Sequence, residues 1–457
     1  MFLEEWIHDR IKRTIREDPE YYPHISSERL LRRDIEAFQL LQMRRALGYA
    51  YQKSTFYREL FDKAGVKPDD IQSIDDLARI PFTRPSDLAQ TPYKLLCISL
   101  GEIERAYTLS SAGTTGTPKK LFFTESELDL TADYMGAAMK TVATLGGAGS
   151  AGYVVFILLP DGKPASQANL LAEGVNRHGG IAIKADITLD TEGQMKAIEE
   201  ATPDILFGSV SRLWRTTQEA RQTRDLRKMG VKILFLTSEY LPDAMRQELA
   251  RAWGCEVYLH YGMTEMGFGG AIECLVHEGF HFNEADFLFE VVDPVSGRAS
   301  KDGEEGELVF TTLSREGMPL IRYKTGDLTR LICGPCGCGA STLQRVGRVA
   351  KRIGAGIRIG EGEEIHPTLF DDVLYQIPNL VGYLLLVTRE GRKEGLICKV
   401  EIDRRELNIE QKIIEALLGI PQIGKNVEAG LMVEPHVEFA DPGTLKRAGR
   451  AKQRIID

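Results

Sequence analysis

Short apolar runs alternate with amphipathic segments through the middle of the chain. The strand-like runs occupy residues 152–160, 204–210, 232–239 and 256–265. Segments with the apolar spacing of helices separate them, near residues 166–178, 191–201 and 241–254. Strands joined through helices pair in parallel, because the chain must cross over the sheet between them. This pattern predicts a layered α/β sheet in the centre of the chain.

The two ends of the chain follow other patterns. Residues 27–66 predict helices with one apolar face. Residues 280–345 contain short β-like runs with Gly and Pro turns, which predict a β-rich subdomain. After residue 348 an α+β pattern begins, with a β-hairpin about residues 390–395 and a helix over 408–419.

These patterns divide the chain into two parts. A length of 457 residues exceeds one ordinary domain. We therefore expect an α/β fold with a large N-terminal layered α/β domain, including its β-rich subdomain, over residues 1–347. A small α+β domain is expected over residues 348–457.

Composition excludes several classes of protein. The chain is 43% apolar and 27% charged, which is typical of a globular protein, and no run of 18 apolar residues predicts a membrane-spanning helix. The N-terminal segment contains Glu and Asp and lacks an apolar signal core, so a cytoplasmic location is expected. A formal net charge of −9 with mixed signs argues against nucleic acid as a partner.

Residues 110–120, SSAGTTGTPKK, carry hydroxyls, glycines and lysines and almost nothing that fills a core. Gly113 and Gly116 allow tight turns that expose backbone N–H groups, and Lys119 adds positive charge, so the loop suits phosphate. The spacing differs from the Walker pattern, and a flexible hairpin turn is the alternative. Thr124 and Glu127 form a capping box before a long helix.

Four stretches in order resemble the motifs of the adenylate-forming superfamily. They are residues 111–119, YGMTE at 261–265, YKTGD at 323–327 and RVGR at 345–348. Residues 47–83, YGMTEMG, EC at 273–274 and PLIRYKTGDL are similar to phenylacetate-CoA ligases and their relatives, and this resemblance covers most of the chain. Residues 150–200 depart from the Gly- and aromatic-rich segment that this family has near its acyl pocket, so the resemblance does not name the acid.

The resemblance implies an ATP site and assigns roles within it. Thr264 would touch the α-phosphate, Glu265 would help to hold Mg²⁺, and Asp327 would accept hydrogen bonds from the ribose hydroxyls. Tyr261 would stack on adenine. The nucleotide-binding set it implies is Ser111, Gly113, Thr114, Thr115, Gly116, Thr117, Lys119, Ser238, Glu239, Tyr261, Gly262, Met263, Asp327 and Arg348. Taken singly, Glu265 could instead form a surface salt bridge and Asp327 could cap a turn.

The implied reaction joins a carboxylic acid, with aryl or arylacetic acids favoured, to the α-phosphate of ATP and releases pyrophosphate. The acyl group then passes to CoA, and the small C-terminal domain is mobile between the two steps. Its hinge position holds Ala350 where the family has Asp or Lys. We assign the catalytic lysine to Lys452; Arg450 is the alternative, and a solvated basic tail is the other interpretation.

Three cysteines in CGPCGCGA, residues 333–340, have the spacing of a metal knuckle. In relatives of phenylacetate-CoA ligase, structural zinc is held by a Cys, a His seven residues later and a Cys-x-Cys. Cys274, His281, Cys336 and Cys338 match that set residue by residue. Cys333 and His277 are spare candidates, and free buried thiols are the alternative.

We expect an AMP-forming acid–CoA ligase that uses ATP, Mg²⁺ and CoA with structural Zn²⁺. Two other functions remain open at this stage. One is an adenylating enzyme with another acceptor, a carrier-protein thiol or a deazaflavin hydroxyl. The other is a non-catalytic nucleotide-binding relative. The resemblance is compatible with a homodimer.

Overall fold

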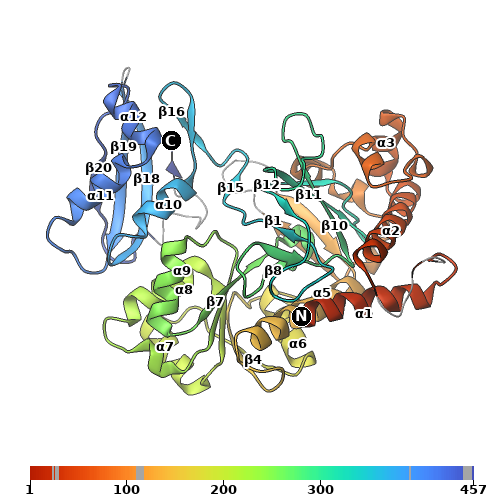
Figure 1. The fold of residues 1–457 in the computed structure, drawn as a ribbon, viewed down its shortest axis with the longest axis horizontal. Coiled ribbons are helices and arrows are strands. Elements are labelled where there is room, and N and C mark those ends of the chain that lie inside the picture. Colours follow the sequence, from red (N-terminus) through yellow and green to blue (C-terminus); the bar gives the residue numbers. More distant parts are fainter. Residues whose placement is uncertain (23–24, 26–29, 110–117, 391–392, 446–454, 457) are drawn as a thin grey trace. The chain divides into compact units, whose positions relative to one another are not determined.

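The computed structural model describes residues 1–22, 25, 30–109, 118–390, 393–445 and 455–456 (Figure 1). The chain forms two compact units. The first contains Met1–Lys184 and Tyr258–Val349, and the second contains Ala185–Val257 and Ala350–Asp457. Each unit draws on two separate stretches of sequence. The expected division at residues 347 and 348 therefore stays a prediction.

Helices make up the N-terminal part of the first unit: α1 (Phe2–Glu17), α2 (Arg32–Lys53), α3 (Thr55–Ala64) and α4 (Pro85–Gln90). Helix α1 buries Leu3, Ile7, Ile11 and Ile15, whose spacing of four residues forms one apolar stripe. Among the described residues, no helix is long and apolar enough to cross a lipid bilayer.

A hairpin and a long helix frame the hydroxyl-rich loop. Strand β1 (Arg105–Leu109) pairs antiparallel with β2 (Lys119–Phe123), with Leu109 opposite Lys119. Helix α5 (Glu125–Leu145) begins with the predicted capping box, in which the Thr124 hydroxyl accepts a hydrogen bond from the Glu127 backbone N–H. That prediction is confirmed.

Helix α5 packs closely on α6 (Gln167–Arg177) through two glycines. A Cβ atom built on Gly136 would lie 2.1 Å from the backbone oxygen of Gly174, and one built on Gly174 would lie 2.0 Å from the oxygen of Ala132. Only glycine permits this approach of the two backbones. Helix α6 also joins β3 (Val154–Leu158) to its parallel partner β4 (Ile181–Lys184).

Two antiparallel arrangements complete the first unit and carry most of the candidate site. One contains β7 (Glu256–Tyr261), β8 (Ala271–Glu273), β9 (Phe280–Phe282), β13 (Leu331–Ile332) and β14 (Arg345–Val346). The other contains β10 (Phe287–Val292), β11 (Gly306–Thr312) and β12 (Tyr323–Thr329). The stacked rings of Phe282 and Phe289, with centroids 4.3 Å apart, join the two arrangements. The β-rich character predicted for residues 280–345 is confirmed.

The second unit contains a parallel pair and a four-stranded sheet. Strands β5 (Ile205–Ser209) and β6 (Ile233–Thr237) are parallel, and the helices beside them are α7 (Thr191–Ala201), α8 (Val210–Ala220) and α9 (Asp243–Trp253). The sheet has the order β20 (His436–Phe439), β19 (Lys393–Ile402), β18 (Leu380–Glu390), β21 (Ile455–Ile456). Further elements are β15 (Lys351–Arg352), β16 (Ile357–Ile359), β17 (Glu363–Ile365), α10 (Pro367–Leu374), α11 (Ile409–Leu418) and α12 (Pro421–Glu428).

The C-terminal pattern read from the sequence matches these elements. Strands β18 and β19 form the predicted antiparallel hairpin, with Glu390 opposite Lys393, and α11 falls within the predicted helix. Helix α8 contacts this sheet: the Trp214 indole donates to the Leu380 oxygen at 3.1 Å, and Arg215 pairs with Glu401 through both carboxylate oxygens. The mixed α/β class predicted from the sequence is confirmed.

Candidate active site

Glu265 lies where two distant segments of the first unit meet. It sits in a short 3₁₀ turn (Thr264–Met266) directly after β7 and is 2% exposed. Lys119, the first residue of β2, forms an ion pair with Glu265 Oε1. The hydroxyl of Tyr323, the first residue of β12, donates to the same oxygen at 3.0 Å. The motif glutamate is therefore a buried, paired carboxylate and not part of a surface salt bridge.

The surroundings of Glu265 favour its charged form. Burial by itself raises the pKa of this carboxyl, but Lys119 and the hydrogen bond from Tyr323 hold the pKa below its ordinary value of 4.5. The guanidinium of Arg315 donates to the backbone oxygen of Glu265 at 2.8 Å and so fixes the main chain of the turn. Glu265 is thus an ionised acid at neutral pH, held at both its side chain and its backbone.

Asp327 has a similar tyrosine partner. The hydroxyl of Tyr261, the last residue of β7, donates to Asp327 Oδ2 at 2.7 Å. Asp327 lies inside β12 and is 8% exposed, and its backbone N–H donates to the Thr325 hydroxyl at 3.0 Å. The aspartate therefore belongs to a strand, which excludes the alternative that it caps a turn.

The residues between Tyr261 and Glu265 form a tight connection. A Cβ atom on Gly262 would lie 2.6 Å from the backbone oxygen of Phe268, so only glycine fits there. The backbone oxygen of Met263 accepts from the N–H groups of Met266 and Phe268 at 2.9 and 3.0 Å. These contacts set the path that leads from β7 through Thr264 to Glu265.

Several predicted nucleotide residues cannot be placed beside these carboxylates. Ser111, Gly113, Thr114, Thr115, Gly116, Thr117 and Lys452 lie outside the described residues. Arg348 is partly buried in the first unit, in the segment after β14.

The remaining two members of the nucleotide set lie in the second unit, directly after β6. Glu239 accepts from the backbone N–H and the hydroxyl of Ser211, at 2.9 and 2.8 Å, near the N-terminus of α8. Ser238 has a φ of 75°, a backbone conformation that costs energy for a residue other than glycine. Such strain is characteristic of functional positions, and here it falls on a residue of the implied nucleotide-binding set.

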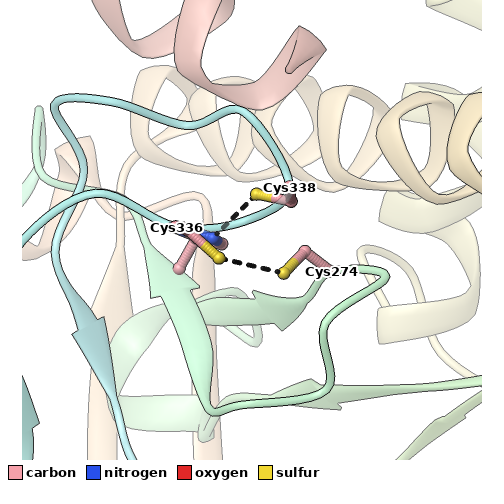
Figure 2. Close-up of side chains that lie close together, drawn as sticks. Cys274, Cys336 and Cys338 are labelled. Carbon is pink, nitrogen blue, oxygen red and sulfur yellow. Dashed lines mark hydrogen bonds between the residues drawn. The ribbon is translucent and has the colours of Figure 1, made fainter.

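The four residues predicted as metal ligands come together. The ligand atoms of Cys274, His281, Cys336 and Cys338 all lie within 4.8 Å of one another. Figure 2 shows the Sγ atoms of the three cysteines directed toward one another from two loops, with Cys274 and Cys336 3.6 Å apart. Cys338 Sγ lies 3.4 Å from Nε2 of His281. A zinc tetrahedron with bonds of about 2.3 Å has edges of about 3.8 Å, so both distances suit one shared ion.

Contacts within the cluster shift the pKa values of two of its thiols in opposite directions. The contact with Cys274, followed by that with His281, holds the pKa of the Cys338 thiol well below its ordinary range, whereas Cys274 has its pKa raised by the same contact with Cys338. Nδ1 of His281 is buried and has no hydrogen-bond partner among the described residues. The two spare candidates lie elsewhere: His277 faces Glu273 at 3.4 Å, and Cys333 is exposed.

Comparison with known proteins identifies the class. The family model described as AMP-binding enzyme matches residues 99–314, and the model described as AMP-binding enzyme C-terminal domain matches residues 362–457. Phenylacetate-coenzyme A ligase of Thermus thermophilus is 30% identical in an alignment of 458 positions that covers 96% of this chain and 99% of that protein. The enzyme of the same name from Aromatoleum evansii is 32% identical over 93% of this chain and 94% of its own length. The chain belongs to the phenylacetate-CoA ligase family of AMP-binding enzymes.

Solved structures agree on the fold. The structure of 2-hydroxyisobutyryl-CoA ligase in the postadenylation state, in complex with 2-HIB-AMP, aligns with a TM-score of 0.78 at 21% identity, over 96% of this chain and 91% of that one. The same enzyme with CoA in the thioesterification state aligns with a TM-score of 0.65 at 22% identity, over 96% and 91%. Both are acyl-CoA ligases in name, and at these identities the likeness concerns the fold alone.

Two contributors to the site were not predicted from the sequence. Tyr323 opens the YKTGD motif, but the resemblance implies a role only for the aspartate of that motif. Arg315 lies outside all four motifs. A buried hydroxyl that bonds an acid 58 residues away leaves no local signal, because its partner is decided by how the strands pack.

Proposed function

We propose that this protein activates a carboxylic acid, with aryl or arylacetic acids favoured, at a nucleotide site built on Lys119, Glu265 and Asp327. ATP-dependent activation of an acid and its transfer to CoA, with release of AMP, is the activity of the family to which the chain belongs. The Lys119–Glu265 ion pair carries the proposal. It joins the end of the hydroxyl-rich loop to the second motif inside one compact unit.

The first half-reaction requires two anions to approach each other. Lys119 and the residues of the 111–117 loop would hold the β- and γ-phosphates, and Thr264 would contact the α-phosphate. Asp327 would accept from the ribose hydroxyls. Lys452 is the proposed source of the positive charge that offsets the approach of the carboxylate to the α-phosphate.

The residues present are chemically suited to Mg²⁺ at Glu265. Magnesium prefers carboxylate and phosphate oxygens, and Glu265 is a buried carboxylate held in its charged form. The bonds from Lys119 and Tyr323 both end on Oε1, so neither occupies Oε2. A magnesium ion bound there would neutralise phosphate charge. The protein would contribute the Glu265 carboxylate, held in a fixed position.

Structural zinc is proposed at Cys274, His281, Cys336 and Cys338. Three thiols and an imidazole within 4.8 Å form a closed ligand set with no open position for water. His281 would coordinate through Nε2, the ring nitrogen that lies 3.4 Å from Cys338 Sγ. This ion would stabilise the first unit and take no part in the reaction.

CoA is the proposed acceptor, because the relatives are CoA ligases by name. A carrier-protein thiol or a deazaflavin hydroxyl is the alternative acceptor, and a non-catalytic relative is the other alternative. Location in the cytoplasm, the absence of nucleic-acid and membrane partners, and a homodimer stay predictions from the sequence.

Acid-dependent exchange of pyrophosphate into ATP tests the proposal. Wild-type protein is assayed with aryl, arylacetic and short aliphatic acids, followed by acyl-CoA analysis after addition of CoA. We expect exchange and thioester formation with one aryl or arylacetic class. Exchange without a CoA product would favour the other acceptors, and absence of exchange with every acid would contradict an adenylating function.

A further inference from the structure

The two motif acids are bonded reciprocally by the two motif tyrosines. Tyr261 and Glu265 belong to one motif, and Tyr323 and Asp327 belong to the other. Yet Tyr261 donates to Asp327 at 2.7 Å, and Tyr323 donates to Glu265 at 3.0 Å. Each motif therefore supplies the acid of one pair and the hydroxyl of the other.

Strand geometry explains how this pattern arises. In β12 every second residue is buried, including Tyr323, Thr325 and Asp327, although the register with β11 shifts beside Thr325 and Asp327. Four residues separate Tyr323 from Asp327, so the two hydroxyl–acid contacts fall at opposite ends of the YKTGD motif. The order of the contacts shows that the segment from Tyr261 to Glu265 runs in the opposite direction beside this motif. The two hydrogen bonds therefore hold the YGMTE segment beside the YKTGD segment in an antiparallel direction.

The tyrosines are rigid donors, whereas the other side-chain partner of Glu265 is flexible. Tyr323 is 0% exposed and its ring packs against Phe310 with centroids 5.4 Å apart. The ring of Tyr261 packs against Phe280 at 6.0 Å. Lys119 has a long side chain with four rotatable bonds and sits at the end of the phosphate loop, where its charge can turn to a ligand. A packed phenol can keep Glu265 in place when the lysine moves.

We propose that Tyr323 and Tyr261 are positioning residues, which orient Glu265 toward the magnesium–phosphate end of the nucleotide and Asp327 toward its ribose end. This inference rests on the proposed function. It assigns separate duties to the two hydroxyls. Loss of the Tyr323 hydroxyl should affect ligands that carry Mg²⁺ and phosphates, and loss of the Tyr261 hydroxyl should affect every ligand that carries the ribose.

Binding measurements separate the two duties without relying on activity. Titration calorimetry is performed with AMP in the absence of metal and with Mg²⁺–ATP, on wild type, Tyr323→Phe and Tyr261→Phe. A buried hydrogen bond to a charged group predicts a loss of about ten-fold. We expect Tyr323→Phe to weaken Mg²⁺–ATP about ten-fold and leave AMP unchanged, and Tyr261→Phe to weaken both.

Tyr134→Phe is the matched control. Tyr134 is a buried tyrosine of the same unit, and its hydroxyl has no hydrogen-bond partner among the described residues. Both affinities should be unchanged in this variant. Equal weakening of AMP and Mg²⁺–ATP by Tyr323→Phe would overturn the proposal, because a general loss of structure affects both ligands alike. Unchanged affinities in both test variants would overturn it as well.

Double-mutant cycles provide a second and independent test. Tyr323→Phe should add little further loss of Mg²⁺–ATP affinity in a Glu265→Gln background, and Tyr261→Phe should add little loss of AMP affinity in an Asp327→Asn background. Additive losses would contradict the pairing. Wild-type affinity for AMP reports on the proposed function separately: if wild type binds no nucleotide, the function fails, and if it binds and the variants show no selectivity, only this inference fails.

Discussion

The carboxylate of Glu4 accepts hydrogen bonds from both the backbone N–H and the hydroxyl of Thr342, each at 2.7 Å. The Ser341 N–H donates to the same oxygen at 2.9 Å, and His8 Nε2 lies 2.8 Å from the Thr342 hydroxyl. Helix α1 is thereby fastened to the loop that carries Cys336 and Cys338. Two of the proposed zinc ligands, Cys336 and Cys338, therefore belong to the loop that holds helix α1.

Removal of a zinc ligand should therefore destabilise the first unit. In His281→Ala and Cys338→Ser, we expect the zinc content to fall from about one ion per chain to none. We also expect a loss of unfolding free energy on the order of 4 kcal/mol. Elemental analysis and thermal melting measure the two quantities. Cys333→Ser, which alters an exposed neighbour outside the cluster, should change neither. A stable, zinc-free wild type would contradict the assignment.

Lys119 should be essential for pyrophosphate exchange, whereas the adjacent Lys120 should not be. Lys119→Met removes the partner of Glu265 and a proposed phosphate ligand, so the exchange rate should fall about 10² to 10³-fold. Lys120 is the control, because its ammonium group instead contacts the Tyr93 hydroxyl at 3.0 Å. Lys120→Met should retain most of the activity in the same assay. Similar losses in the two variants would show that only the charge of the loop matters.

The C-terminal lysine can be tested by separating the half-reactions. Lys452→Ala should lower acid-dependent pyrophosphate exchange about 10² to 10³-fold, because it removes the charge that offsets two approaching anions. Thioester formation from a preformed acyl-adenylate should continue. Arg450→Ala is assayed in parallel and should retain exchange. The reverse result would move the catalytic charge to Arg450.

The buried ion pair of the second unit should be costly to break. Arg215 and Glu401 are 14% and 4% exposed at their side chains, and Glu401 also accepts from the Gly443 N–H at 2.7 Å. Glu401→Gln leaves the buried guanidinium with only its longer 3.4 Å pair to Glu219, which should cost about 3 kcal/mol in urea unfolding. Glu199→Gln, which breaks the more exposed pair with Arg224, should change the stability much less.

Stability should fall at low pH through Asp133. The hydrogen bond with His178, together with that from the Trp6 indole, holds the pKa of Asp133 below its ordinary value of 3.8. A depressed pKa contributes stability above the unfolded value, and this contribution is lost as the pH falls through the folded value. Asp133→Asn should therefore be less stable than wild type by about 1–2 kcal/mol at pH 7. The difference should shrink below pH 3.8, as measured by urea unfolding across pH. A difference independent of pH would exclude titration of this group as its cause.

The sequence by itself determined the local elements and the residue types of the site. The capping box at Thr124 and Glu127 and the hairpin of β18 and β19 follow from interactions between residues close in the chain. The cysteine spacing indicated a metal knuckle, and the resemblance to phenylacetate-CoA ligases implied the four residues that the fold brings within 4.8 Å. Motif order was enough to indicate the family, because each motif is short and contiguous.

Tertiary structure decided which side chains form hydrogen bonds with Glu265 and Asp327. It also decided which stretches of sequence make up each compact unit. Tyr323 and Glu265 are 58 residues apart in the sequence, and Arg215 and Glu401 are 186 residues apart. Contacts at such separations leave no periodic signal in the sequence. Such contacts exist only once strands and helices have packed, since packing alone brings distant side chains together. The sequence therefore named the two acids, while the fold determined that a tyrosine of the opposite motif orients each of them.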